Sequence, residues 1–204
     1  RIKHSTRHAI IQQKDEVTLL YLSDHQVRHV RMDVPHSDHL TATWQGESVG
    51  HYEGDTLVID TIGQRVGPLS MVDRFGTPFS AALHVIERYR LIDGATARDL
   101  QLKHESTYFG AGRSSPPNNP YGRGDIDPDA TKPGLQVEVT VDDPAIFTTT
   151  WSGLVTYRHV QGEWPEAVCA ENTYGSGTSS VSTSLSSTCI FSSCLVPEAD
   201  QSDF

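Results

Sequence analysis

The hydrophobic residues of this chain fall in short runs in which apolar and polar positions alternate. Successive side chains of a strand point to opposite faces, so this alternation is typical of half-buried β-strands rather than helices. The runs also contain many β-branched and aromatic residues, which favour strands. The predicted strands are Glu16 to Leu22, Gln26 to Met32, Thr56 to Ile62, Ala82 to Leu91, Leu135 to Val141 and Leu154 to Val160.

Turn-forming residues separate these runs, at Gly63 to Pro68, at Gly76 to Pro78 and at Pro144. Short connections favour a meander in which successive strands are antiparallel neighbours. A sheet of about eight or nine strands leaves two edges exposed unless it curls shut. We therefore predict an all-β fold, an antiparallel meander that closes into a lipocalin-like barrel, with a β-sandwich as the alternative.

Two segments depart from the strand pattern. Residues 94–134 begin with a segment of helical character, Ala95 to Tyr108, and continue into a stretch rich in Gly, Pro, Asn and Asp. We interpret them as an excursion, of the length typical of a lid, a binding loop or a partner contact. Residues 174–204 are rich in Ser and Thr. The predicted organisation is one β domain over residues 1–173 and a C-terminal extension over 174–204, either flexible or extended along the body.

Charge and hydropathy narrow the range of partners. The 204 residues carry a formal net charge of -10, which works against binding to nucleic acid or to anionic lipid. No apolar run approaches the roughly 20 residues that a membrane helix needs, so we predict no membrane insertion. The expected partner is a small neutral or cationic molecule or another protein, and a homo-oligomer remains open.

Three cysteines, Cys169, Cys189 and Cys194, allow at most one internal disulfide. Cys189 and Cys194 are close enough to pair if the chain turns between them, which would fit an oxidising compartment. Because the chain begins at Arg1 and not at Met, we expect a processed or truncated N-terminus.

Four separate motifs follow one another within residues 16–172. They are VGHYEGDTLVIDTIG (Val49 to Gly63), MVDRFGTPFSAALHVIERYRLID (Met71 to Asp93), LQVEVTVDDPAIFTTTW (Leu135 to Trp151) and EWPEAVCAEN (Glu163 to Asn172). The chain resembles a family of hypothetical bacterial proteins with the signature EGDTLVxDT, LHVxERYR, TVDDPxxFTxPW and CxEN, usually behind a secretion signal. The resemblance implies an exported, lipocalin-like β protein, and hence a periplasmic or secreted location. Relatives often carry His where this chain has Phe79, so no mechanism that needs that imidazole is expected here.

The run Ala82 to Leu91 supplies the first candidate for chemistry. Period-two alternation divides it into an apolar face that should point inward and a second face with His84 and two arginines. The predicted inward residues are Leu83, Val85, Glu87, Tyr89 and Leu91. Glu87 would then be a carboxylate among hydrophobic groups, where desolvation raises its pKa and suits it to acid/base work. The alternative is that Glu87 pairs with an arginine near the barrel mouth.

Three further residues complete the predicted catalytic set. Asp60 lies between Val58 and Ile62 on one strand face, and if it shared an interior with Glu87 the two carboxylates could divide acid and base roles. His84 would replace them if a one-residue bulge turned it inward. Tyr89 either donates a hydrogen bond to a ligand or fills the core.

Other polar side chains are expected to bind ligand or to shape turns. The expected ligand-binding residues are Trp44, His51, Trp151 and Tyr157. Gly54 and Asp55 are interpreted as a hairpin turn between two strands. The pair His36 and His39 lacks a defined third ligand, so we predict no metal site. Without a GxSxG, Walker or GxGxxG motif, we also predict no cofactor.

These patterns lead to a functional hypothesis with alternatives. We predict that the barrel binds a small, largely apolar organic molecule and performs cofactor-free acid/base chemistry of the isomerase, lyase or hydratase type. One alternative is a carrier with the same interior and no chemistry. The other is an interaction or assembly module. The residues leave open whether the protein is an enzyme.

Overall fold

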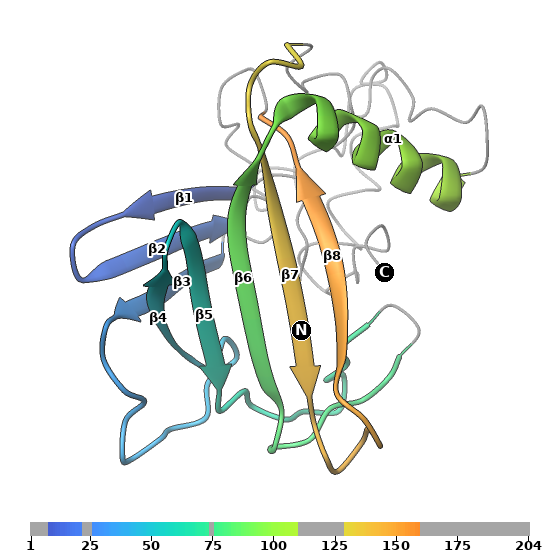
Figure 1. Cartoon of the computed structure of the whole chain (residues 1–204). Coiled ribbons are helices and arrows are strands. Elements are labelled where there is room, and N and C mark those ends of the chain that lie inside the picture. Colours follow the sequence, from blue (N-terminus) through green and yellow to red (C-terminus); the bar gives the residue numbers. More distant parts are fainter. Residues whose placement is uncertain (1–7, 22–25, 74–75, 110–128, 160–204) are drawn as a thin grey trace, which may run out of the picture.

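The described residues form one sheet of eight strands and one helix (Figure 1). A computed structural model describes residues 8–21, 26–73, 76–109 and 129–159, with side chains omitted at 104–109. The elements are β1 (His8–Gln12), β2 (Glu16–Tyr21), β3 (Gln26–Met32), β4 (Glu47–Glu53), β5 (Thr56–Ile62), β6 (His84–Ile92), α1 (Gly94–Phe109), β7 (Gly134–Asp142) and β8 (Trp151–Tyr157). The all-β prediction is confirmed.

The strands follow one another across the sheet in sequence order, as a meander requires. Six of the neighbouring pairs are antiparallel, and β3 and β4 are parallel. This parallel pair departs from the predicted antiparallel meander. Residues 33–46 make it possible, because they carry the chain back along the sheet before β4 begins. Within this crossover, Thr43 forms a parallel bridge to Gln64 after β5.

The sheet curls into a half-barrel, which confirms the barrel-like prediction and not the sandwich. Among the described residues, no backbone pairing joins the outer strands β1 and β8. A ring contact joins them instead, since the His8 and Tyr157 rings lie edge to face with centroids 4.3 Å apart. The two ends of the sheet therefore meet through side chains.

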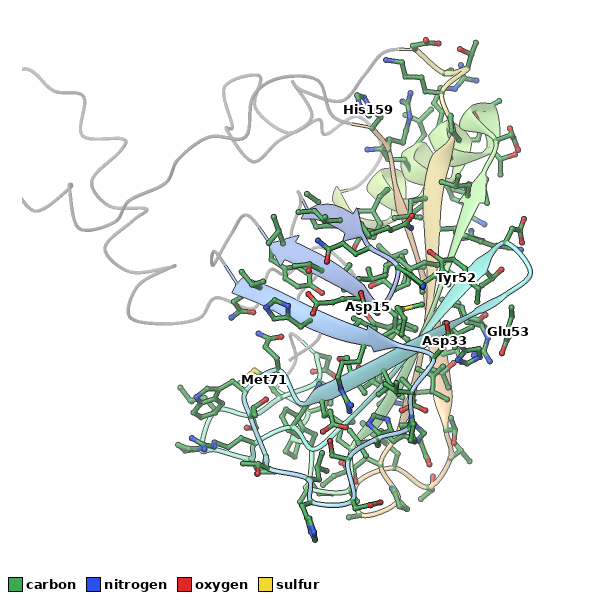
Figure 2. The ribbon with its side chains drawn as sticks, turned by 90° about the vertical axis from the view of Figure 1, so that its left-hand side faces the viewer. Asp15, Asp33, Tyr52, Glu53, Met71 and His159 are labelled. Atoms are coloured by element: carbon green, nitrogen blue, oxygen red, sulfur yellow. The ribbon has the colours of Figure 1, made fainter. Side chains whose placement is uncertain are left out.

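Gly54 and Asp33, both with left-handed backbone, lie at the ends of strands. The β4–β5 hairpin turns through Gly54 at φ 65°, with Glu53 and Thr56 paired beside it, which confirms the predicted turn. Asp33, at φ 56°, follows β3, and its N–H donates to the Gly50 carbonyl at 2.8 Å. In the side view of Figure 2, Glu53 lies at the tip of the hairpin and Met71 lies in the separate group of loops below the sheet.

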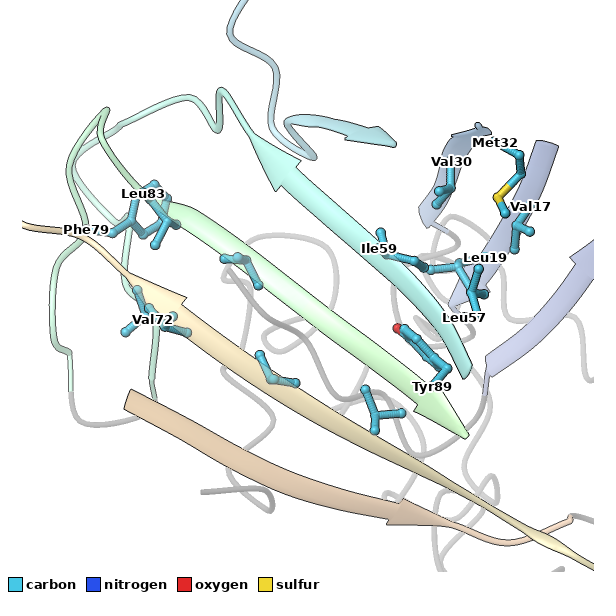
Figure 3. Packing of buried hydrophobic residues seen from close by; sticks show 14 residues of the cluster. Val17, Leu19, Val30, Met32, Leu57, Ile59, Val72, Phe79, Leu83 and Tyr89 are labelled. Atoms are coloured by element: carbon cyan, nitrogen blue, oxygen red, sulfur yellow. The ribbon is translucent and has the colours of Figure 1, made fainter. Parts of the chain in front are cut away.

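The core lies on the concave face of the sheet, where side chains of β2 and β3 meet those of β5, β6 and β7 (Figure 3). Leu83, directly before β6, and Val85, within β6, are buried there as predicted, whereas Leu91, also predicted to point inward, is exposed. Phe79 is also a core residue. The cluster comprises Val17, Leu19, Val30, Met32, Leu57, Ile59, Val72, Phe79, Leu83, Val85, Tyr89, Val137, Val139 and Val141.

The helical segment predicted in the excursion is present as α1, which contacts β7 and β8. Asp93 caps it, because its Oδ1 accepts the Thr96 N–H at 2.9 Å. The hydrogen bond from Thr96 also lowers the pKa of the Asp93 carboxyl. Close packing explains Gly134, since a Cβ there would lie 2.3 Å from that of Ala97. The rest of the excursion, at 110–128, and the extension at 174–204 lie outside the described residues.

A buried carboxylate fixes the loop before β6 to the loop after β7. Asp143 is fully buried and accepts the backbone N–H of Ser80 at 2.6 Å and its hydroxyl at 2.7 Å. These bonds join two segments that are 63 residues apart in the sequence. No helix in the described part of the chain is long and apolar enough to cross a membrane.

Candidate functional site

A network of hydrogen-bonded polar groups lies inside the apolar concave face. Arg28 of β3 forms an ion pair with Glu87 of β6, and both side chains are at least nine-tenths buried. Arg28 also donates to the hydroxyls of Ser48 at 2.9 Å and Thr61 at 2.7 Å, which come from β4 and β5. The inner polar cluster, as we call Arg28, Ser48, Thr61, Glu87 and Tyr89, thus draws on four neighbouring strands.

The two tyrosines of this region, Tyr21 and Tyr89, are neutral. Tyr89 donates to the second carboxylate oxygen of Glu87 at 3.0 Å. Burial, reinforced by the charge of Glu87, raises the pKa of Tyr89 well above its ordinary value. Burial also raises the pKa of Tyr21, against the opposing effect of Arg28. Both oxygens of Glu87 therefore accept hydrogen bonds, as those of an ionised carboxylate do.

Arg28 keeps its charge inside the half-barrel. Burial alone would lower the pKa of its guanidinium, but the nearby Glu87 and tyrosines outweigh burial and raise it. The cluster then holds one positive and one negative charge, which cancel. This arrangement corresponds to the alternative interpretation of Glu87, in which its carboxylate pairs with an arginine.

His8 of β1 lies beside this cluster. Its ring contacts Tyr157, and its register partner across β2 is Tyr21. Burial lowers the pKa of His8 to about 4, although the negative charge of Glu87 acts to raise it. His8 is therefore neutral near pH 7. Within the described part of the chain no hydrogen bond to its ring is recorded, so a neutral imidazole with one donor and one acceptor borders the cluster.

The inner face of β8 is the less tightly covered side of the concavity. Its inward row is Trp151, Gly153, Val155 and Tyr157, and the three residues with side chains are only partly buried. Gly153 leaves a gap in this row, because a Cβ built on it meets no atom within 4 Å. The register runs from Gly153 through Val139 to Glu87, so the gap lies in the same row as the ion pair.

A second polar group lies on the convex face of the sheet. Asp60 of β5 accepts hydrogen bonds on one carboxylate oxygen from two imidazoles, His84 Nε2 at 2.8 Å and His36 Nε2 at 3.0 Å. All three side chains are about one-fifth to one-third exposed. The outer histidine cluster, as we call Asp60, His36 and His84, is therefore open to solvent.

The crossover residues 33–46 supply one member of this outer histidine cluster. His36 Nδ1 lies 3.3 Å from a carboxylate oxygen of Glu47, which also accepts from Arg31 at 2.7 Å. The backbone N–H of Ser37 donates to the same oxygen at 2.7 Å. The hydrogen bonds from Ser37 and His36, together with the charge of Arg31, outweigh the effect of burial and lower the pKa of Glu47.

The four predicted catalytic residues form two pairs on opposite faces. The register opposes Ile59 to Glu87 and Asp60 to Ile86, which places the two carboxylates on different sides of the sheet. Tyr89 joins Glu87 inside, and His84 joins Asp60 outside. Asp60 and Glu87 therefore do not share an interior. No bulge turns His84 inward, because β6 pairs without interruption with β7.

The predicted ligand-binding residues also divide. Trp151 and Tyr157 lie in the inward row of β8 and pack against the core. His51 is on the convex face, where its ring lies 3.2 Å from a Glu53 oxygen. Trp44 belongs to the crossover and is 65% exposed, with Arg65 stacked 5.4 Å from its ring centroid. Neither His51 nor Trp44 lines the interior, contrary to the barrel-binding expectation.

Sequence reasoning missed the residues that complete both clusters. Arg28 occupies an inward position in the alternating run QVRHVRM, so its strand face was readable, although its partner was not. His36 was considered only as a metal ligand. Among the described residues no group of three or more His, Cys, Asp or Glu side chains is arranged to hold a metal ion.

Comparison with known proteins adds no relative from which a function could be carried over. No protein-family model, no curated protein sequence and no solved structure matches this chain. The family resemblance stays a prediction.

Proposed function

We propose that the concave face of the half-barrel binds a small, largely apolar organic molecule, and that the protein acts as a carrier. The apolar lining would bury most of the ligand, and the inner polar cluster would orient it through a few hydrogen bonds, as is usual for small-molecule sites. A carrier fits better than an enzyme at this place, because Arg28 neutralises Glu87.

The observation that supports this proposal most directly is the open position at Gly153. It lies in a half-buried row with Trp151 and Tyr157, two strands from Glu87. Adjacent strands are about 4.8 Å apart, so a ligand seated over Gly153 would reach the ion pair across about 10 Å of apolar wall.

Filling this position tests the proposal. We expect the wild-type protein to bind an uncharged apolar fluorescent probe, such as N-phenyl-1-naphthylamine, and Gly153→Leu to bind it at least about tenfold more weakly. The leucine meets no atom at Cβ and suits a strand, so the fold should persist. Leu154→Ala is the matched control, because it alters the adjacent residue on the convex face, where Leu154 is 65% exposed. Equal probe affinity of Gly153→Leu and wild type would reject the concave face as the site.

Acid/base catalysis of the isomerase, lyase or hydratase type is the second candidate. It is favoured by the outer histidine cluster, in which Asp60 holds two solvent-accessible imidazoles at 2.8 and 3.0 Å. A carboxylate that orients an imidazole is a common arrangement for proton transfer. Here Asp60 is a positioning residue and His84 the proposed base.

The two candidates differ in which variant loses activity. If the outer histidine cluster is catalytic, wild type should turn over compounds from a panel of small aromatic and terpenoid molecules. His84→Gln should not. Glu87→Gln should then retain turnover, since Glu87 lies on the other face. A carrier would deplete none of the compounds and would still bind the fluorescent probe.

A further inference from the structure

The charge balance of the concave face bears on the kind of ligand it would accept. Arg28 and Glu87 carry opposite charges and are paired. The other titratable groups recorded beside them, His8, Tyr21 and Tyr89, are neutral near pH 7, because burial lowers the pKa of His8 to about 4 and raises those of both tyrosines. Among the described residues, these surroundings therefore offer hydrogen bonds without a net charge.

The hydrogen bonds of Arg28 explain why its positive charge is not available to an anionic ligand. Its Nε and Nη2 groups are occupied by Ser48, Thr61 and Glu87. A ligand carboxylate that took the place of Glu87 on the guanidinium would leave a buried carboxylate without its cation. That exchange is unfavourable, because an unpaired charge in an apolar interior loses its solvation without compensation.

A neutral hydroxyl or carbonyl group meets no such obstacle. The His8 ring has no hydrogen-bond partner recorded within the described part of the chain, and in its neutral form it offers one donor and one acceptor. Its contact with Tyr157 places it next to the inward row of β8 that contains Gly153. A ligand over that row would thus have a neutral imidazole at hand for its polar group.

We propose that the concave face selects neutral ligands that carry a hydroxyl or carbonyl group and rejects the corresponding carboxylates. This inference rests on the proposed carrier function and specifies its ligand class. It assigns His8 as the hydrogen-bonding residue for the ligand. It assigns Glu87 as the residue that excludes anions, by occupying Arg28 and by repelling a second carboxylate.

The test compares two ligands that differ only in their polar end, 1-dodecanol and dodecanoate, by displacement of the fluorescent probe near pH 8. Wild type should bind the alcohol at least tenfold more tightly than the acid. Salt at about 0.5 M should preserve the ratio, because it screens the general repulsion by the acidic surface but not a buried charge. Glu87→Gln frees Arg28 and should shift the ratio at least tenfold toward the acid. Glu53→Gln, at the exposed hairpin tip, should leave it unchanged.

The outcomes separate this inference from the function on which it rests. If neither the probe nor either ligand binds wild type, the carrier function fails. If both ligands bind and dodecanoate binds as tightly as dodecanol, the carrier function stands and the ligand class is wrong. Should Glu87→Gln fail to fold, the wild-type ratio still decides. His8→Phe, which keeps the aromatic ring, should then lower the affinity for dodecanol at least fivefold, and an unchanged affinity would contradict the role of His8.

Discussion

At the scale of single residues, the buried ion pair between Arg28 and Glu87 depends on the presence of both partners. Two charges leave water to lie inside an apolar sheet, and their attraction offsets this desolvation only while both are present. Hydroxyls of Ser48 and Thr61 complete the hydrogen bonds of the arginine. Removing one partner should therefore cost far more than removing both.

This asymmetry predicts an outcome for unfolding in urea. Glu87→Met should lower the free energy of unfolding by about 3 kcal/mol, because it leaves Arg28 buried without an anion. The double variant Arg28→Met/Glu87→Met should recover most of that loss. Glu53→Met provides the control, since Glu53 and Arg88 form an exposed pair at 4.0 Å that contributes about 0.5 kcal/mol or less. A double variant no more stable than the single one would contradict a buried, mutually compensating pair.

His8 predicts how stability responds to acid. Its pKa falls from 6.5 to about 4 on folding, so between these pH values the unfolded chain binds a proton that the folded chain does not. Its contribution is fully present above pH 6.5 and is lost as the pH falls toward 4. Over this range, wild type should lose on the order of 2 kcal/mol more than His8→Phe. The measurement is urea unfolding of both proteins at each pH, and parallel losses would show that His8 is not buried in its neutral form.

At the scale of elements, the alternating pattern predicted most strands and the inward face of β6. The predicted strand Thr56 to Ile62 has the same bounds in the structure, and Glu87 and Tyr89 are buried as expected. Two strands, β1 and β4, were not individually predicted. β4 contains Gly50 on its inward side, where Val30 and Met32 fill the space that a side chain would take. Because glycine has no side chain, a glycine at a core position gives no hydrophobic signal in the sequence.

The sequence pattern predicted neither the register of neighbouring strands nor which strands pair in parallel. The faces of Asp60 and Glu87 follow from how β5 aligns with β6, and a shift by one residue would have put both carboxylates inside. The parallel pairing of β3 and β4 depends on the crossover at residues 33–46, whose polar composition indicates only a loop. Contacts between residues far apart in the sequence, such as the ion pair between Arg28 and Glu87, 59 residues apart, depend on the register and on the direction of pairing.

Two glycines in neighbouring strands should respond in opposite ways to the same substitution. Gly134→Ala should destabilise the protein by about 2 kcal/mol, because its Cβ would collide with Ala97 of α1 at 2.3 Å. Gly153→Ala should raise stability by about 0.5 kcal/mol, since the position is open and glycine is unfavourable within a strand. Thermal unfolding of both variants checks the pair. A loss of stability in Gly153→Ala would mean that the position is not open.

At the scale of the whole molecule, the curled sheet separates two environments. Its concave face holds an apolar lining with one compensated ion pair, and its convex face holds the solvent-accessible imidazoles around Asp60. The proposed ligand-binding face and the proposed proton-transfer site therefore lie on opposite sides of one sheet. The net charge of -10 adds a field that disfavours anions at either face.

The central claim, that ligand binds on the concave face, is tested most directly by locating the ligand. Protein with labelled valine methyl groups would be titrated with 1-dodecanol and followed by NMR. We expect the methyl signals of Val139 and Val155, on the inward rows of β7 and β8, to shift in a saturable manner. The signals of Val58, which points to the convex face, should stay in place. Saturable shifts at Val58 without shifts at Val139 and Val155, or no saturable shift at all, would contradict the central claim.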